Sequence, residues 1–85
     1  MPASIKVKVL YFAQAREAAG ASKEEITLPF PAFIDNLFTK ILEHHPDIAA
    51  IREIVSVSVN YKITNENIAL RKGDEIALLP PVTGG

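Results

Sequence analysis

Residues 33–45 read FIDNLFTKILEHH, and the apolar side chains in this stretch recur at helical spacing. Positions i, i+3, i+4, i+7 and i+8 are held by Ile34, Leu37, Phe38, Ile41 and Leu42. Because a helix has about 3.6 residues per turn, this spacing places them in one stripe along its side. Pro46 ends the helix, and Asp47 is expected to cap a further turn that carries Ile48. The stretch therefore predicts one long amphipathic helix that packs on a single apolar surface.

On both sides of this helix, apolar and polar residues alternate as they do in β-strands. Residues 5–12 put Ile5, Val7, Val9 and Tyr11 on one face and Lys6, Lys8, Leu10 and Phe12 on the other. Since the lysines mark the second face as the solvent-exposed one, Leu10 and Phe12 are predicted to point outward. In residues 75–79 the same rule turns Leu79 outward. Further strands are predicted at residues 22–28, 54–60 and 68–70, and a short helix at residues 13–19.

The order of these elements is strand, short helix, strand, long helix and then further strands. This order predicts an α+β fold of the β-grasp (ubiquitin-like) kind, a roll in which one long helix crosses a mixed sheet. A ferredoxin-like sandwich fits the pattern nearly as well, but the single strongly periodic helix favours the roll. We place the folded domain at residues 1–79 and an extended C-terminal tail at residues 80–85.

The composition excludes several classes of function. The chain has 85 residues, a formal net charge of −1 and no cysteine. A chain of this charge lacks the basic surface of a nucleic-acid binder, and no apolar run reaches the ~20 residues that cross a membrane. Without cysteine the chain has no disulfide, no thiolate metal ligand and no thiol nucleophile. We therefore expect a cytosolic protein with no nucleic-acid partner, no membrane and no metal site.

No combination of side chains predicts a catalytic site. His44 and His45 are adjacent, so their rings point in different directions on a helix and do not form a shared metal face. Both are interpreted as favourable cations at a helix C-terminus. Residues 23–25 (Lys-Glu-Glu) are interpreted as a solvated strand edge, and Tyr11 and Tyr61 as core or rim aromatic residues.

The end of the chain is unusual because it carries no charged side chain after Glu75. Residues 80–85 read PPVTGG, and the two prolines cannot donate ladder hydrogen bonds, so the strand should end at Leu79 and the tail should leave as a stiff, extended segment. Gly84 and Gly85 lack a Cβ, so the walls of a narrow channel can close on their backbone. The segment predicted to thread such a channel in another protein is Pro80, Pro81, Val82, Thr83 and Gly84, with the carboxylate of Gly85 at its end.

Two segments resemble the small subunits of molybdopterin synthase. The resemblance is most specific in residues 73–85, GDEIALLPPVTGG, and a second matching segment is residues 11–17, YFAQARE. Chain length and element order also agree with that family. The resemblance therefore covers essentially the whole sequence and implies the same β-grasp fold.

The resemblance also implies that Gly85 is the working residue. In this family an adenylyltransferase of the ubiquitin-activating type uses ATP and magnesium to convert the terminal carboxylate to a glycyl adenylate. Sulfur from a separate donor then replaces the nucleotide and leaves a thiocarboxylate (1-thioglycine) on Gly85. The tail enters the large subunit of the synthase, which uses the sulfur to convert cyclic pyranopterin monophosphate to molybdopterin in molybdenum cofactor biosynthesis. The small subunit is then a non-catalytic sulfur donor in a heterotetramer.

The outward-facing apolar residues are expected to serve those partners. Phe12 and Leu79 lie near the strand ends beside the tail, and Ile63 is expected to join them. We predict that these three residues form an apolar patch on which the activating enzyme and the large subunit dock in turn. The alternative is that a neighbouring loop buries Phe12 and Leu79. Arg16 is interpreted as part of a solvated helix face rather than as an anchor for a partner's carboxylate.

Two other functions remain open on the sequence. Sulfur carriers of thiamine synthesis and the ubiquitin-like modifier that thiolates transfer RNA also end in Gly-Gly, although their chains usually differ in length and lack the PPVTGG ending. A β-grasp interaction module without covalent chemistry is the other possibility. Deletion of Gly85 separates the module from a carrier, because the module would keep its binding and its activity.

Overall fold

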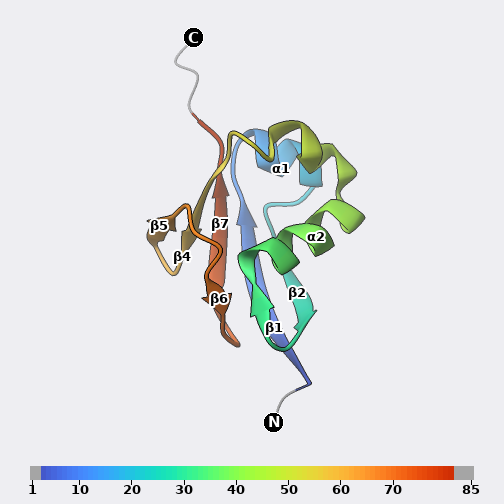
Figure 1. The fold of residues 1–85 in the computed structure, drawn as a ribbon. Helices are drawn as coiled ribbons and strands as arrows, with labels where there is room; N and C mark the ends of the chain where they lie inside the picture. Colours follow the sequence, from blue (N-terminus) through green and yellow to red (C-terminus); the bar gives the residue numbers. More distant parts are fainter. Residues whose placement is uncertain (1–2, 82–85) are drawn as a thin grey trace.

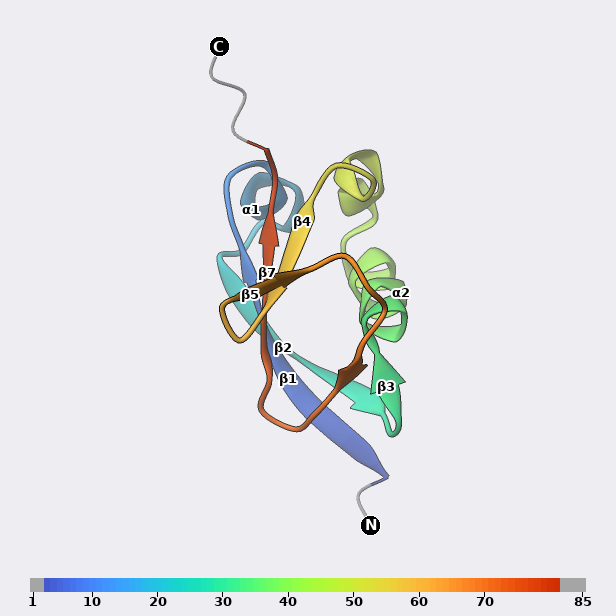
Figure 2. The same ribbon diagram turned by 60° about the vertical axis from the view of Figure 1, so that its left-hand side comes forward.

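The computed structural model describes residues 3–81 and shows a β-grasp fold. Its main element is a five-stranded mixed sheet with the order β2-β1-β7-β4-β5, and a two-stranded ribbon pairs β3 with β6 (Figure 1). The helices lie against one face of the main sheet (Figure 2). The strands are β1 Ser4–Tyr11, β2 Lys23–Pro29, β3 Ala32–Phe33, β4 Ser56–Val59, β5 Lys62–Thr64, β6 Ala69–Leu70 and β7 Glu75–Leu79, and the helices are α1 Gln14–Ala19, α2 Ile34–His44 and the 3-10 helix η1 Pro46–Ile51.

Strands β1 and β7 form the parallel centre of the sheet, with Tyr11 opposite Leu78. Strand β2 pairs antiparallel with the other edge of β1, and β4 pairs antiparallel with β7. Because β1 and β7 run in the same direction, both strands finish at the same end of the sheet (Figure 1). The end of β7 therefore lies at the same end of the sheet as α1, which follows β1.

The core lies between α2 and the inner face of the sheet. The predicted stripe of α2 is confirmed, because Ile34, Leu37, Phe38 and Ile41 are buried and Leu42 is partly buried. The side chains of the sheet that belong to this core include Val7, Val9, Ile26, Leu28, Val57, Val59, Ile76 and Leu78. The predicted alternation of the first strand is also confirmed, since Ile5, Val7, Val9 and Tyr11 are buried while Lys6 and Lys8 are exposed.

Helix α1 ends at Ala19, the predicted last residue, and Gly20 caps it. Gly20 has a φ of 72°, and its N–H donates to the carbonyl oxygen of Arg16. A residue without a Cβ adopts this left-handed conformation at little cost. The cap turns the chain back into β2, which pairs with β1 along its whole length from Ser4 opposite Pro29 to Leu10 opposite Lys23.

Several predicted boundaries are wrong for local reasons. The strand predicted at residues 22–28 runs instead from Lys23 to Pro29, because β2 is an edge strand in which a missing N–H is tolerated. Asp47 does not cap the turn after α2, because His45 holds the N-cap position of η1 and Asp47 lies in its first turn. The strand predicted at residues 54–60 begins only at Ser56, since the N–H groups of residues 54 and 55 both donate to the carbonyl oxygen of Ile51.

Two short paired segments, β3 and β5, were not predicted at all. They contain only two and three residues, so neither shows enough alternation to be detected in the sequence. Within residues 3–81, no helix is long and apolar enough to cross a membrane.

Candidate functional site

The candidate site begins where β7 ends. Leu79 is half-buried and pairs with Ser56 of β4, Pro80 is buried, and Pro81 is exposed. Strand β7 is paired on both sides, by β1 and β4, as far as Leu78, and with β4 alone at Leu79. The predicted tail residues Val82, Thr83, Gly84 and Gly85 lie outside the described residues, so their roles stay predictions.

The sheet face opposite the helices carries a band of small and apolar side chains. The register places Leu10 opposite Ala77, Ala77 opposite Ser58, and Ser58 opposite Ile63, which is a continuous row across β1, β7, β4 and β5. Side chains opposite one another in neighbouring strands lie on the same face. Ala77 and Ser58 in the middle of the row are buried, although they lie on the face opposite the helices.

The three residues of the predicted patch lie on this open face, but they are not one tight cluster. Phe12 is 46% exposed and follows directly after the Tyr11–Leu78 pair, which puts it beside Leu79. Ile63 is 70% exposed on the edge strand β5, so β4 separates it from the other two. The alternative in which a loop buries Phe12 is not what the structure shows. Docking at these residues stays a prediction.

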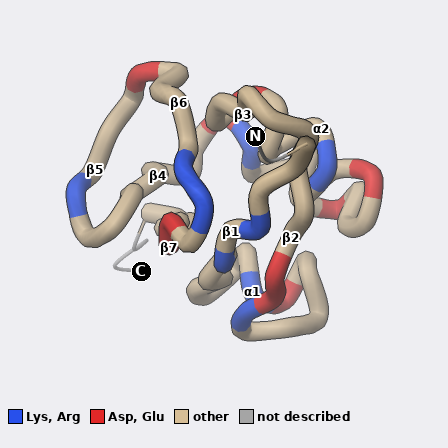
Figure 3. Tube along the Cα trace, turned by 90° about the horizontal axis from the view of Figure 1, so that it is seen from below, with Lys and Arg blue, Asp and Glu red and all other residues tan. Residues whose placement is uncertain are grey.

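Charged residues occupy the other half of the same face. In the strand register, Lys8 lies opposite Glu25 of β2 on one side and opposite Glu75 of β7 on the other. Figure 3 shows basic residues along β1 and in the segment between β6 and β7, and acidic residues in β2 and at the start of β7. The face is therefore divided into a charged half at the start of β7 and an apolar half at its end, where the tail begins.

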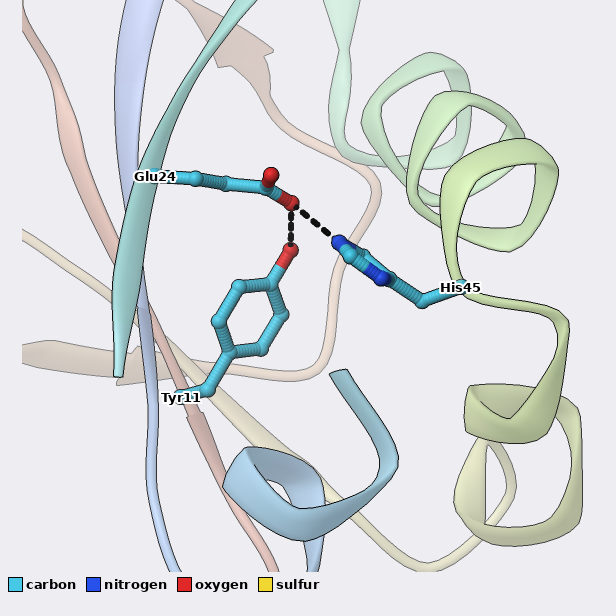
Figure 4. A network of polar contacts seen from close by, with 3 residues as sticks. All are labelled: Tyr11, Glu24 and His45. Carbon is cyan, nitrogen blue, oxygen red and sulfur yellow. Dashed lines mark hydrogen bonds and ion pairs between the residues drawn. The ribbon is translucent and has the colours of Figure 1, made fainter. Parts of the chain in front are cut away.

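A polar cluster inside the fold was not predicted from the sequence. The hydroxyl of Tyr11 donates to Glu24 Oε1, and His45 Nε2 lies 2.8 Å from the same oxygen (Figure 4). The rings of Tyr11 and His45 also meet edge to face, with centroids 5.7 Å apart. Residues 23–25 were interpreted as a solvated edge, which holds for Glu25 but not for the partly buried Glu24.

This cluster joins β1, β2 and the end of α2. Burial, together with the hydrogen bond to Glu24, raises the pKa of the Tyr11 phenol far above its ordinary value. The phenol therefore stays protonated and acts as a donor, so the cluster has the chemistry of a structural link and not of a nucleophile or base. The interpretation of His45 as a cation placed favourably at a helix C-terminus is incomplete, because its Nε2 also contacts Glu24.

A groove of about 770 Å³ lies between the start of α2 and residues 63–67. Arg52, Phe38 and Asp35 line this groove. The Arg52 guanidinium lies over the Phe38 ring, with its carbon 3.7 Å from the ring centre, and one of its nitrogens is 3.7 Å from Asp35 Oδ1. Within residues 3–81, no three His, Asp or Glu side chains are placed to hold a metal ion. The groove brings together no set of groups with a recognisable catalytic arrangement.

Comparison with known proteins gives consistent matches over nearly the whole chain. Residues 9–85 match the model of the ThiS family. The molybdopterin synthase sulfur carrier subunit of Chlamydomonas reinhardtii is 34% identical over 83 residues, which are 95% of this chain and 100% of that protein. The solved structure of SAMP1 from Haloferax volcanii has the same fold, with a TM-score of 0.85, 24% identity and coverage of 94% of this chain and 99% of that one. A chain in the complex of subunits 1 and 2 of the molybdopterin-converting factor from Helicobacter pylori matches with a TM-score of 0.69 and 24% identity over 95% of this chain and 100% of that one.

Proposed function

This chain belongs to the ThiS family, and from that membership we propose that it is the sulfur carrier subunit of a molybdopterin synthase, with the C-terminal carboxylate of Gly85 as the group that carries sulfur. The observation that carries the proposal is the match to proteins named molybdopterin synthase sulfur carrier subunit, which spans 95% of this chain and all of the relative from Chlamydomonas reinhardtii. The chain also has the terminal Gly-Gly that the chemistry requires.

The chemistry of the proposal needs no side chain of this protein. A carboxylate is a poor electrophile because its charge is delocalised and oxide is a poor leaving group. Attack of a Gly85 carboxylate oxygen on the α-phosphate of ATP releases pyrophosphate and gives an acyl adenylate. Sulfide supplied by a separate donor then attacks the acyl carbon and displaces AMP, which leaves a thiocarboxylate on Gly85. This route explains how a chain without cysteine carries sulfur.

The remaining groups belong to the partners. An adenylyltransferase of the ubiquitin-activating type binds ATP and magnesium, and the large subunit of the synthase binds cyclic pyranopterin monophosphate and accepts the sulfur. The complex of subunits 1 and 2 from Helicobacter pylori supports a large-subunit partner.

The apolar half of the open sheet face, with Phe12, Leu79 and Ile63, is the proposed docking surface for both partners. We place this activity in the cytosol and expect a heterotetramer of two small and two large subunits.

The test is a mass spectrum of the intact protein after incubation with ATP, magnesium and the adenylyltransferase of the same organism. The expected result is an AMP adduct on Gly85, and addition of a sulfur donor should replace it with a gain equal to the mass difference between sulfur and oxygen. A variant without Gly85 should give neither product while keeping the thermal unfolding of the wild type. Absence of both products in the wild type, under conditions in which a related carrier is modified, contradicts the proposal.

The same experiment separates the pathways that share this chemistry. The thiocarboxylated protein should convert cyclic pyranopterin monophosphate to molybdopterin when the large subunit is added. If it instead supplies sulfur only to a thiazole synthase, the chemistry is right and the assigned pathway is wrong.

A further inference from the structure

The turn between β4 and β5 has two residues in the left-handed conformation. Asn60 has a φ of 51° and Tyr61 a φ of 72°, and Val59 pairs with Lys62 across the turn. Two consecutive positive φ values in a two-residue hairpin loop are the mark of a type I′ turn. Such turns favour Asn followed by Gly, because glycine has no Cβ to collide with the backbone.

Asn60 fits this turn, whereas Tyr61 does not. Asparagine tolerates the left-handed conformation, and the Asn60 side chain is held by Asp74 and by the N–H of Glu75. A tyrosine in the second position costs conformational energy that a glycine would avoid. The Tyr61 side chain is 87% exposed, so little burial in this chain offsets that cost.

Tyr61 lies next to the apolar half of the open sheet face. Ile63, two residues later, ends the row that runs through Ser58 and Ala77 to β1. The N–H of Asn60 donates to the carbonyl oxygen of Glu75, so the turn lies beside the start of β7, whose alternate residues Glu75, Ala77 and Leu79 share that face. Interaction with the Glu75 carboxylate raises the pKa of the Tyr61 phenol. The tyrosine therefore stands at the border between the charged and apolar halves.

We propose that Tyr61 is a binding residue for the large subunit, an aromatic anchor that extends the docking surface from the end of β7 to the tip of the β4–β5 hairpin. The proposal rests on the proposed function, because it needs the same partner on the same face. Tyrosine is among the residue types that contribute most to protein interfaces, since its ring buries a large area and its hydroxyl can bond at the rim. Strain at an exposed non-glycine residue is explained when the side chain is buried in the complex.

The test measures stability and binding in the same variant. Tyr61→Gly should raise the melting temperature by about 4–8 °C, because it relieves the left-handed strain. The same variant should bind the large subunit of the same organism at least ~10-fold more weakly by titration calorimetry. Tyr61→Phe should keep most of the affinity but none of the extra stability.

The matched control is Phe30→Ala, which removes an exposed aromatic side chain from the loop between β2 and β3. It should leave the affinity unchanged. If Tyr61→Gly binds as tightly as the wild type, the anchor role is wrong. If it lowers the melting temperature, the strain argument is wrong. A wild-type protein that binds no large subunit at all contradicts the proposed function instead.

Discussion

Asn60 connects two turns through one side chain. Its Nδ2 donates to Asp74 Oδ1 at 2.9 Å, and its Oδ1 accepts from the N–H of Glu75 at 3.0 Å. The substitution Asn60→Ala removes both bonds and places an alanine at a φ of 51°. We expect a loss of about 1–3 kcal/mol in the free energy of unfolding, measured by urea denaturation. Asn65→Ala, at an exposed position, is the control, and equal losses in the two variants would show that the connection contributes nothing.

Tyr11 gives the protein a pH dependence at alkaline pH. Burial raises the pKa of its phenol above the ordinary value of 10.0, so the unfolded chain loses this proton at a lower pH than the folded one. The stabilisation is complete below the unfolded pKa and decreases as the pH rises from there toward the folded pKa, by up to about 1.4 kcal/mol per pH unit.

The variant Tyr11→Phe lacks the titrating group, so its unfolding free energy should fall less steeply than that of the wild type between about pH 9 and pH 11.5. Urea denaturation curves at several pH values in this range measure the difference. All other groups are the same in the two proteins, so their contributions cancel in the comparison. Parallel slopes for the two proteins would refute the assignment to Tyr11.

Helix α2 shows which elements the sequence predicts well. Its stripe spans three turns, and every predicted inward position is buried or partly buried. Ile41 is fully buried and Leu42 is only partly so, although both belong to the apolar stripe. We expect Ile41→Ala to cost about 2–5 kcal/mol in the free energy of unfolding, because it leaves a cavity under the helix. Leu42→Ala should cost distinctly less in the same denaturation measurement, and a reversed order would mean that the helix is rotated.

Short strands are not predicted from the sequence, because residues far away in the chain determine whether they pair. The pairing of Ala32 with Leu70 is long-range, and two residues carry no periodicity of their own. The hairpin at Asn60-Tyr61 was missed for a different reason, since the second position lacks the glycine that usually marks such a turn. The Tyr11, Glu24 and His45 cluster joins three elements, so no local pattern reveals it.

At the scale of the whole molecule, local features of the sequence predict where β7 ends and that Phe12 is exposed, but not how the strands are ordered. The uncharged ending and its two prolines are local features, and β7 does end at Leu79 as predicted. The outward direction of Phe12 followed from parity with the lysines of β1, and its exposure confirms that direction. The separation of Ile63 from Phe12 and Leu79 was not predicted, because it follows from the order of the strands in the sheet. The alternation of apolar and polar residues along a strand does not determine that order.

The division of the open face leads to a prediction about both partners. The same tail must enter the adenylyltransferase and the large subunit, so a single patch at its start should serve both in turn. Phe12→Asp puts a charge into that patch, and we expect it to weaken binding to each partner at least ~10-fold, measured separately by titration calorimetry. Phe33→Asp is the matched control, because Phe33 is also an exposed phenylalanine but lies at the N-cap of α2, where aspartate is favourable. The control should bind both partners normally. Weakened binding to only one partner in Phe12→Asp would show that the two proteins recognise different surfaces, and that only the tail is common to both complexes.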